Sequence, residues 1–293
     1  MKAMVALIQR EYLEHKGAFL YAPLVILGLV ALIMLAALGT DRIGPKMALG
    51  ATHKIFEMGY LVTSGLWFIY LMAALFFYYA DAFNADRRSN SMLFWKSMPV
   101  SDFRVLSSKL LAGFTIFPTL IFLAMIGGVI LATGMSTIAV FRLASPVLPD
   151  FGMLLASAGQ ILVFDVVFVV FALLWYAPFF AWVGMLSTFV GRWSIPLAFL
   201  IPGLVGAFEN LLFDDAGGPR AGYVLDYLRY RAEFVPEKGA LETQIFSLQP
   251  FDAVMQIADL LARIDWVQLG GGVAVAVLFV YIASEYRRRM IIA

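Results

Sequence analysis

Few residues of this sequence are of a type that could carry chemistry, and Asp165 is the most isolated of them. It is the one charged residue among positions 151–191, a strongly apolar stretch. A carboxylate in such a stretch is costly, so it usually faces the interior of a helix bundle or a wet cavity. Three interpretations stay open. Asp165 contacts a substrate or proton on a translocation path, it makes a structural hydrogen bond to a neighbouring helix, or it lies close enough to the outer interface to be hydrated.

The rest of the sequence lacks the residue groups that catalysis or metal binding needs. It has no cysteine, and its two histidines, His15 and His53, are too few and too far apart for a histidine metal site. It contains no Walker A motif, no HExxH motif, no serine elbow and no paired carboxylates within an apolar run. We therefore expect no catalytic residue, no metal site and no cofactor bound by this chain.

A second unusual group of residues lies in the charged segment 81–109, between two long apolar runs. Ser91 can cap a short amphipathic helix that Pro99 ends, and Ser101 can cap the next helix with Asp102 in its first turn. The contact residues expected of the short helix are Ser91, Met92, Leu93, Phe94, Trp95, Lys96, Ser97, Met98 and Pro99. Large apolar side chains in such a polar loop need a surface that buries them.

Two surfaces could bury this short helix. Bases beside the aromatic residues are typical of a helix that lies on lipid, and Arg87, Arg88, Lys96 and Arg104 fit that description. Anchoring aromatic residues are typical of a helix that docks on another protein, and Phe94 and Trp95 fit that description equally well. Composition alone does not separate the two.

The composition of the whole chain is that of a membrane protein. Of its 293 residues, 62% are hydrophobic and 14% charged, whereas soluble domains have about half apolar and about a quarter charged residues. The formal net charge of +1 gives no case for nucleic acid as a partner. These proportions predict an all-α polytopic membrane protein.

Six stretches with little or no charge are long enough to cross a ~30 Å hydrocarbon core as helices. We expect the spans at about residues 17–40, 58–80, 107–134, 157–186, 195–212 and 266–284. Glycines predict that the third helix ends near Gly134. Pro178, Pro196 and Pro202 predict kinks in the fourth and fifth.

The segments outside these spans differ in charge, and the difference predicts a topology. Residues 1–16, which include Arg10 and Glu11, predict an interfacial helix lying on the membrane, with a frayed tail as the alternative. Residues 213–265 form the only sizeable segment expected to be soluble, and 250–264 have helical apolar spacing. Bases gather at both ends of the chain, at Arg192 and in the loop 84–104, so the positive-inside rule places these in the cytoplasm and 213–265 outside.

Taken together, these features resemble the ABC type-2 exporter permeases, the membrane-spanning subunits of ATP-binding cassette transporters. One matching feature is the N-terminal helix with Arg10 and Glu11. The other is a pattern after the second span, formed by Asp86, Arg87, Ser91, Leu93, Met98, Pro99, Val100 and Ser101, with Lys109 opening the third span. The six-span layout and the larger segment before the last span extend the resemblance over nearly the whole chain.

The resemblance implies a function for the short helix. It would be a coupling helix that docks on a separate ABC ATPase subunit, which uses ATP and Mg²⁺. The permease would work as a dimer with a second copy or a homologue, in a bacterial inner membrane, surrounded by lipid. It would export a hydrophobic or amphipathic substrate, and the chain alone would not be an enzyme.

Two other function classes stay open. An ion-driven secondary transporter usually shows internal repeats and several buried polar residues, and this sequence offers only Asp165. A non-transporting scaffold, sensor, immunity or assembly factor, whose external segment binds a ligand or a protein, is the other.

Overall fold

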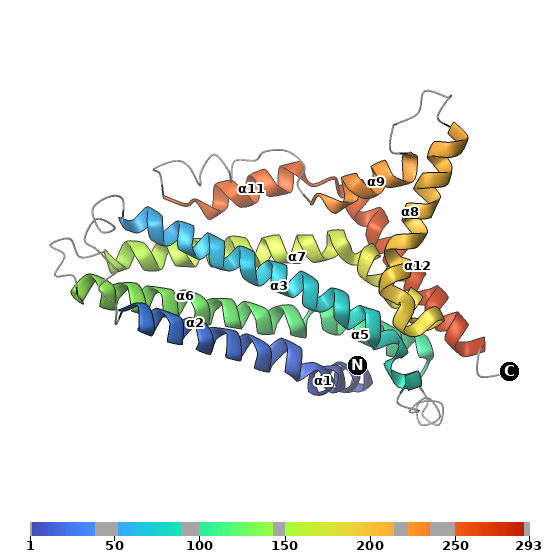
Figure 1. Ribbon diagram of the computed structural model, residues 1–293, viewed down its shortest axis with the longest axis horizontal. Coiled ribbons are helices and arrows are strands. Elements are labelled where there is room, and N and C mark those ends of the chain that lie inside the picture. Colours follow the sequence, from blue (N-terminus) through green and yellow to red (C-terminus); the bar gives the residue numbers. More distant parts are fainter. Residues whose placement is uncertain are drawn as a thin grey trace.

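The computed structural model describes residues 2–38, 52–88, 100–142, 150–213, 222–234 and 250–289, and all regular secondary structure in these ranges is helical (Figure 1). The helices are α1 (Lys2–Lys16), η1 (Gly17–Tyr21), α2 (Ala22–Leu38), α3 (Thr52–Arg88), α5 (Asp102–Phe114), α6 (Ile116–Arg142), α7 (Phe151–Val190), η3 (Gly191–Trp193), α8 (Ser194–Phe213), α9 (Tyr223–Ala232), α11 (Ala253–Arg263) and α12 (Trp266–Arg289). The all-α prediction is confirmed for these residues.

Two long parallel helices, α3 and α7, form the centre of the bundle. Aromatic side chains of the two helices contact each other in pairs, with ring centroids 5.2 Å apart for Phe68 and Phe168 and 5.3 Å apart for Tyr79 and Phe180. The difference in residue number is nearly the same in both pairs, as expected for parallel helices. Helix α6 packs against α3, α2 packs against α6, and α12 packs against α7. Figure 1 shows α2, α3, α6 and α7 running along the long axis of the molecule.

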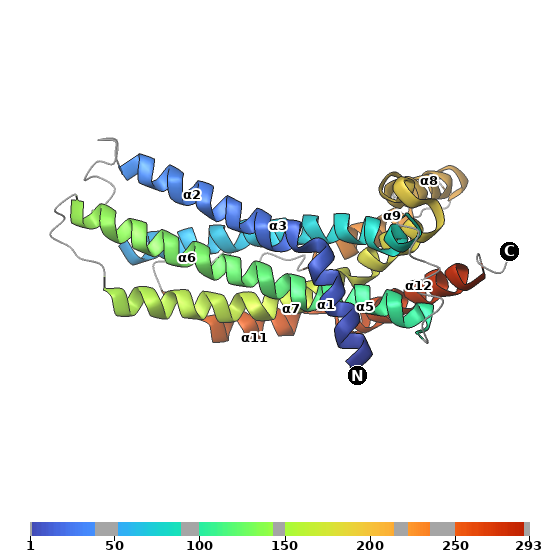
Figure 2. The same cartoon turned by 90° about the horizontal axis from the view of Figure 1, so that it is seen from below.

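The first two helices are joined by a π-helical turn, Gly17–Tyr21, that bends the chain. Figure 2 shows α1 leaving the direction of α2 at this turn. The turn carries Phe19 into the core, where its ring stacks on Phe117 with centroids 3.9 Å apart. One extra residue in a helical turn rotates the following side chains. Residues 2–16 are thus a helix, and the frayed-tail alternative is wrong for them.

The third apolar stretch forms two helices rather than one. Helix α5 begins where the sequence predicts, with the Ser101 hydroxyl accepting a hydrogen bond from the Arg104 amide at 3.3 Å. The expectation that the helix ends near Gly134 is wrong, because α6 continues to Arg142. In apolar surroundings the backbone can satisfy its hydrogen bonds only within the helix, so a glycine does not end it.

A close approach between α5 and α3 requires a glycine. A Cβ atom at Gly113 would meet the ring and hydroxyl of Tyr79, and that hydroxyl donates to the Leu110 carbonyl at 2.8 Å. Helix α5 therefore lies directly against α3, near the end of the bundle where the chain termini lie (Figure 1).

Within the described residues, five stretches are long and apolar enough to cross a membrane: Met4–Ala36, Phe56–Asp86, Asp102–Gly134, Phe151–Leu212 and Trp266–Arg289. The protein is thus a polytopic membrane protein. The fourth stretch has 62 residues and comprises α7, which continues through Pro178, and α8, which continues through Pro202. The chain turns between them at Gly191, whose φ of 59° is a left-handed conformation that suits glycine.

The described parts of segment 213–265, which the sequence predicts to lie outside the membrane, pack on the bundle. Figure 1 shows α11, at almost the predicted position, lying along α7. Buried Arg231 of α9 donates to the Trp175 carbonyl at 2.6 Å, and its guanidinium lies 4.1 Å from the Trp175 ring centroid. Burial lowers the pKa of Arg231. Apolar burial against α7 thus positions α11, whereas the buried guanidinium of Arg231 ties α9 to α7.

Candidate functional site

A group of charged residues, of which Glu11, Asp86, Lys109 and Arg287 are buried and two more are partly exposed, joins four helices at the end of the bundle where the termini lie. We call it the polar cluster, and its members are Arg10 and Glu11 of α1, Asp86 of α3, Asp102 and Lys109 of α5, and Arg287 of α12. Three are acids and three are bases, so their formal charges cancel. A buried charge without a partner of opposite sign is costly, so the fold requires these residues to pair with one another.

Lys109 lies at the centre of the polar cluster and is completely buried, with 0% of its side chain exposed. Its ammonium donates to Glu11 Oε1 at 2.8 Å and lies 3.8 Å from Asp86 Oδ2. The Tyr78 hydroxyl donates to the other oxygen of Glu11 at 3.0 Å. Lys109 thus ties α5 to both α1 and α3.

Arg287 adds the last helix to the polar cluster. Its Nη1 donates to Asp86 Oδ2 at 2.9 Å, and its Nε lies 3.0 Å from Asp102 Oδ1. Arg10 reaches the other oxygen of Asp86 at 3.3 Å. Asp86 therefore faces bases from three different helices, α1, α5 and α12.

The position of the polar cluster in the chain is as informative as its contacts. Asp86 lies in the last turn of α3, and Asp102 is the first residue of α5. These two helices flank the loop that the sequence singles out. A movement of that loop would act directly on two residues of the polar cluster, and through them on α1 and α12.

The structure places some of the site residues predicted from the sequence and does not describe others. Residues 91–99, the expected contact residues, lie outside the described residues. Arg10 and Glu11, expected at the membrane interface, belong to the polar cluster, and only 2% of the Glu11 side chain is exposed. Arg88 pairs with Asp81 at 2.5 Å at the surface, and Arg104 is exposed.

Sequence reasoning missed that Arg287 is buried, because it counted the last three arginines together as bases at the end of the chain. A signal was present. Ala276, Val280 and Ala283 are buried at helical spacing, and Arg287 continues that stripe by one more turn. The helical phase therefore separates Arg287 from its exposed neighbours Arg288 and Arg289.

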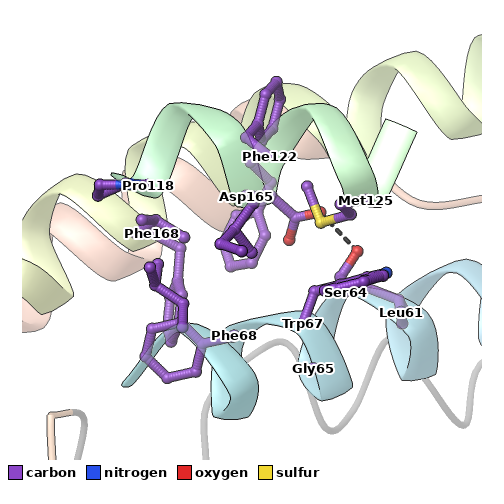
Figure 3. Close-up of a pocket in the computed structure, with 14 residues that line it drawn as sticks. Leu61, Ser64, Gly65, Trp67, Phe68, Pro118, Phe122, Met125, Asp165 and Phe168 are labelled. Carbon is purple, nitrogen blue, oxygen red and sulfur yellow. Dashed lines mark hydrogen bonds between the residues drawn. The ribbon is translucent and has the colours of Figure 1, made fainter. Parts of the chain in front are cut away.

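Asp165 lies in a different environment, at the wall of a cavity of about 250 Å³ between α3, α6 and α7 (Figure 3). Ser64 of α3 donates to its Oδ2 at 2.6 Å, so the structural hydrogen bond considered above is present. Asp165 is only 7% exposed, and among the described residues no basic side chain pairs with it. The cavity wall is otherwise apolar and includes the rings of Trp67, Phe68, Phe122, Phe164 and Phe168.

Another buried carboxylate, Glu57, holds the opposite end of the bundle. It is 0% exposed and accepts hydrogen bonds from Lys54 at 3.1 Å, Ser157 at 2.7 Å and the Phe251 amide at 3.1 Å. These contacts join α3, α7 and the residues that precede α11. Glu57 is thus fully engaged in the fold.

One group of described residues has the composition of a metal site. Ligand atoms of Glu11, Glu14 and His15 lie within 4.8 Å of one another. However, both Glu11 oxygens are engaged, one by the Lys109 ammonium and the other by the Tyr78 hydroxyl. A cation of the protein already occupies this position, so the group does not support a metal site.

No family model, no curated protein and no solved structure matches this chain.

Proposed function

We propose that this chain is the membrane permease subunit of an ATP-driven exporter of the ABC type-2 kind. It spans a bacterial inner membrane six times, with α7 and α8 as separate crossings and with both termini in the cytoplasm. A separate ATPase subunit docks on residues 91–99 and supplies the energy of ATP hydrolysis. Two permease chains, identical or homologous, form the working unit.

The polar cluster is the single observation that carries this proposal. It joins the two helices that flank the docking loop to α1 and α12 through buried ion pairs, of which Lys109 to Glu11 at 2.8 Å and Arg287 to Asp86 at 2.9 Å are the shortest between helices. A buried network of this kind has few alternative arrangements, since breaking one pair leaves a charge without a partner. A push on the loop is therefore passed to four helices together.

This connection suggests how the loop could drive the bundle. When two ATPase subunits close on ATP, the loop moves with them and carries the ends of α3 and α5. The polar cluster makes α1 and α12 follow, and the long helices tilt as a body, which is the rigid-body motion that changes access from one side of the membrane to the other.

The distribution of bases supports the proposed topology. Arg88, Arg104 and the exposed Arg288 and Arg289 lie at the same end of the bundle as the polar cluster. Helix α7 ends at this end and α8 leaves it, so Arg192 of η3 lies there too. An excess of Lys and Arg in short connections is typical of the cytoplasmic side.

Co-purification tests the proposal. In Phe94→Ala with Trp95→Ala, the short helix loses its two largest apolar side chains, so the ATPase should no longer co-purify with the inserted permease. The matched control is Phe208→Ala with Trp266→Ala, which removes two exposed aromatic side chains elsewhere and should retain the ATPase. Equal recovery of the ATPase with both double variants would contradict docking at residues 91–99.

One observation favours a second candidate, an ion-driven transporter. Asp165 is a buried carboxylate beside a cavity in the bundle, as in carriers that couple transport to protons. Transport into inside-out vesicles separates the two functions. The exporter requires ATP and continues when the proton gradient is dissipated, whereas the ion-driven carrier stops.

A further inference from the structure

The cavity beside Asp165 combines one charged wall with an apolar remainder. Asp165 and Ser64 supply its polar atoms, and aromatic rings from all three surrounding helices supply much of the rest (Figure 3). Phe68 comes from α3, Phe122 from α6 and Phe168 from α7. A carboxylate is thus held in a small aromatic chamber without a basic partner among the described residues.

Of the residues that line the cavity, Gly65 of α3 is the exposed one, so we infer that the mouth of the cavity lies there, on an apolar surface of α3. Gly65 has no side chain to close this mouth. Val62, Leu66 and Ile69 are 61%, 64% and 65% exposed. With Gly65 they occupy positions i, i+3, i+4 and i+7, which share one face of a helix. This face meets hydrocarbon, so a molecule that enters beside Gly65 must be soluble in the membrane interior.

We propose that this cavity binds a compact lipophilic organic cation, with its ammonium centre beside Asp165 and its hydrocarbon body between the aromatic rings. The positive charge of the ligand follows from the carboxylate of Asp165. Burial removes the water that would solvate this carboxylate, and a bound cation would compensate for that loss. The aromatic faces add to this attraction, since their electron-rich surfaces favour ammonium groups.

The dimensions of the cavity limit the ligand further. Its volume of about 250 Å³ is below the range of about 300–1,000 Å³ that holds drug-sized molecules. A single-ring ammonium ion fits it better than a large polycyclic cation. The carboxylate of Asp165, the apolar opening beside Gly65 and the small volume of the cavity therefore all favour a compact lipophilic cation.

This inference rests on the proposed function in one respect, since it names the class of substrate that the exporter moves. Binding itself requires no ATPase. The experiment can therefore use the purified full chain alone in lipid nanodiscs, so that failure of the site and failure of the exporter function are separate outcomes.

The ligand pair for the experiment is benzyltrimethylammonium and neopentylbenzene, which have the same shape and differ in charge. Titration calorimetry, corrected with empty nanodiscs, should show the cation binding about tenfold more tightly than the neutral compound. In Asp165→Asn this preference should disappear, because the amide keeps the size of the side chain and loses its charge. The control Asp259→Asn changes an acid of α11 that pairs with Arg263 away from the cavity, and it should retain the preference.

A second pair of variants tests the cavity without touching its charge. A Cβ atom meets no heavy atom within 4 Å at either Gly65 or Gly59, so α3 accepts a side chain at both. Gly65→Leu should abolish cation binding by closing the mouth, while Gly59→Leu, outside the cavity wall, should bind normally. This pair also decides the question if Asp165→Asn does not fold.

The outcomes separate the two proposals. Equal binding of the two ligands by the unchanged chain, or undiminished cation binding by Gly65→Leu, overturns the site while ATPase co-purification stays unaffected. Cation preference that depends on Asp165 and on an open Gly65 supports the site, even where the ATPase fails to co-purify.

Discussion

Asp86 and Asp165 are both buried carboxylates, 1% and 7% exposed, yet their surroundings are opposite. Asp86 faces Lys109, Arg287 and Arg10, which come from three other helices. Asp165 faces one serine and an apolar cavity. The first belongs to a network of ion pairs, whereas the second has no basic partner among the described residues.

The difference teaches what each carboxylate contributes. In a complete buried network, each charge compensates the desolvation of the others, so loss of one member leaves the rest uncompensated. A carboxylate without a basic partner stabilises the fold little and can even cost stability, since its own burial is unfavourable. We therefore expect Asp86 and its partners to maintain the structure. We expect Asp165 to serve a ligand.

The largest effect should come from removing the base at the centre of the polar cluster. Lys109→Met keeps the length and apolar body of the side chain, but it leaves the Glu11 carboxylate without its ammonium partner and removes one of the bases near Asp86. It should destabilise the protein by about 3–5 kcal/mol. Denaturant unfolding of the purified chain in detergent measures this change. The control Arg88→Met, at an exposed pair, should leave stability unchanged.

A double variant tests whether the ion pair between Lys109 and Glu11 explains the effect of Lys109→Met on stability. Adding Glu11→Gln to Lys109→Met removes the uncompensated charge and should restore part of the lost stability. If the double variant were as unstable as the sum of its single variants, the ion pair would not explain the effect of Lys109.

A smaller loss should follow from Arg287→Gln. Asp86 then keeps Lys109 and Arg10, while Asp102 loses its contact with Arg287, and the expected loss of stability is about 1–3 kcal/mol. Arg289→Gln is the matched control two positions later, on the exposed side of α12, and should behave like the unchanged protein in the same unfolding measurement. Equal effects of the two variants would contradict the burial of Arg287.

Much of this architecture is predictable from sequence, since long apolar stretches can hide their backbone only as helices. The start of α5 was predictable because Ser101 and Asp102 form a recognisable cap. The continuation of α6 past Gly134 was not, because glycine's low helix propensity is overruled in apolar surroundings. Local signals therefore fix where helices begin better than where they end.

The two regions also differ in how far sequence could identify them. Asp165 stood out because its neighbours along the chain are apolar, but its partner Ser64 is far away in sequence and carries no distinguishing pattern. The polar cluster is the reverse case. Arg10, Glu11, Asp86 and Arg287 each lie beside another charged residue in the sequence. Only packing separates buried Arg287 or Glu11 from the exposed charges nearby.

The smallest effect on stability should come from Asp165→Asn, and its small size is what distinguishes Asp165 from Asp86. The amide can still accept from Ser64, while the cost of burying a charge is removed, so stability should change by less than about 1 kcal/mol, with an increase as the favoured sign. Ser64→Ala should be worse, with a loss of about 1–3 kcal/mol, because it leaves the carboxylate buried without its hydrogen bond. Unfolding of both variants in the same detergent gives the comparison. A loss for Asp165→Asn as large as that for Lys109→Met would mean that Asp165 is a structural charge like Asp86, and the reason to assign it a cationic ligand would disappear.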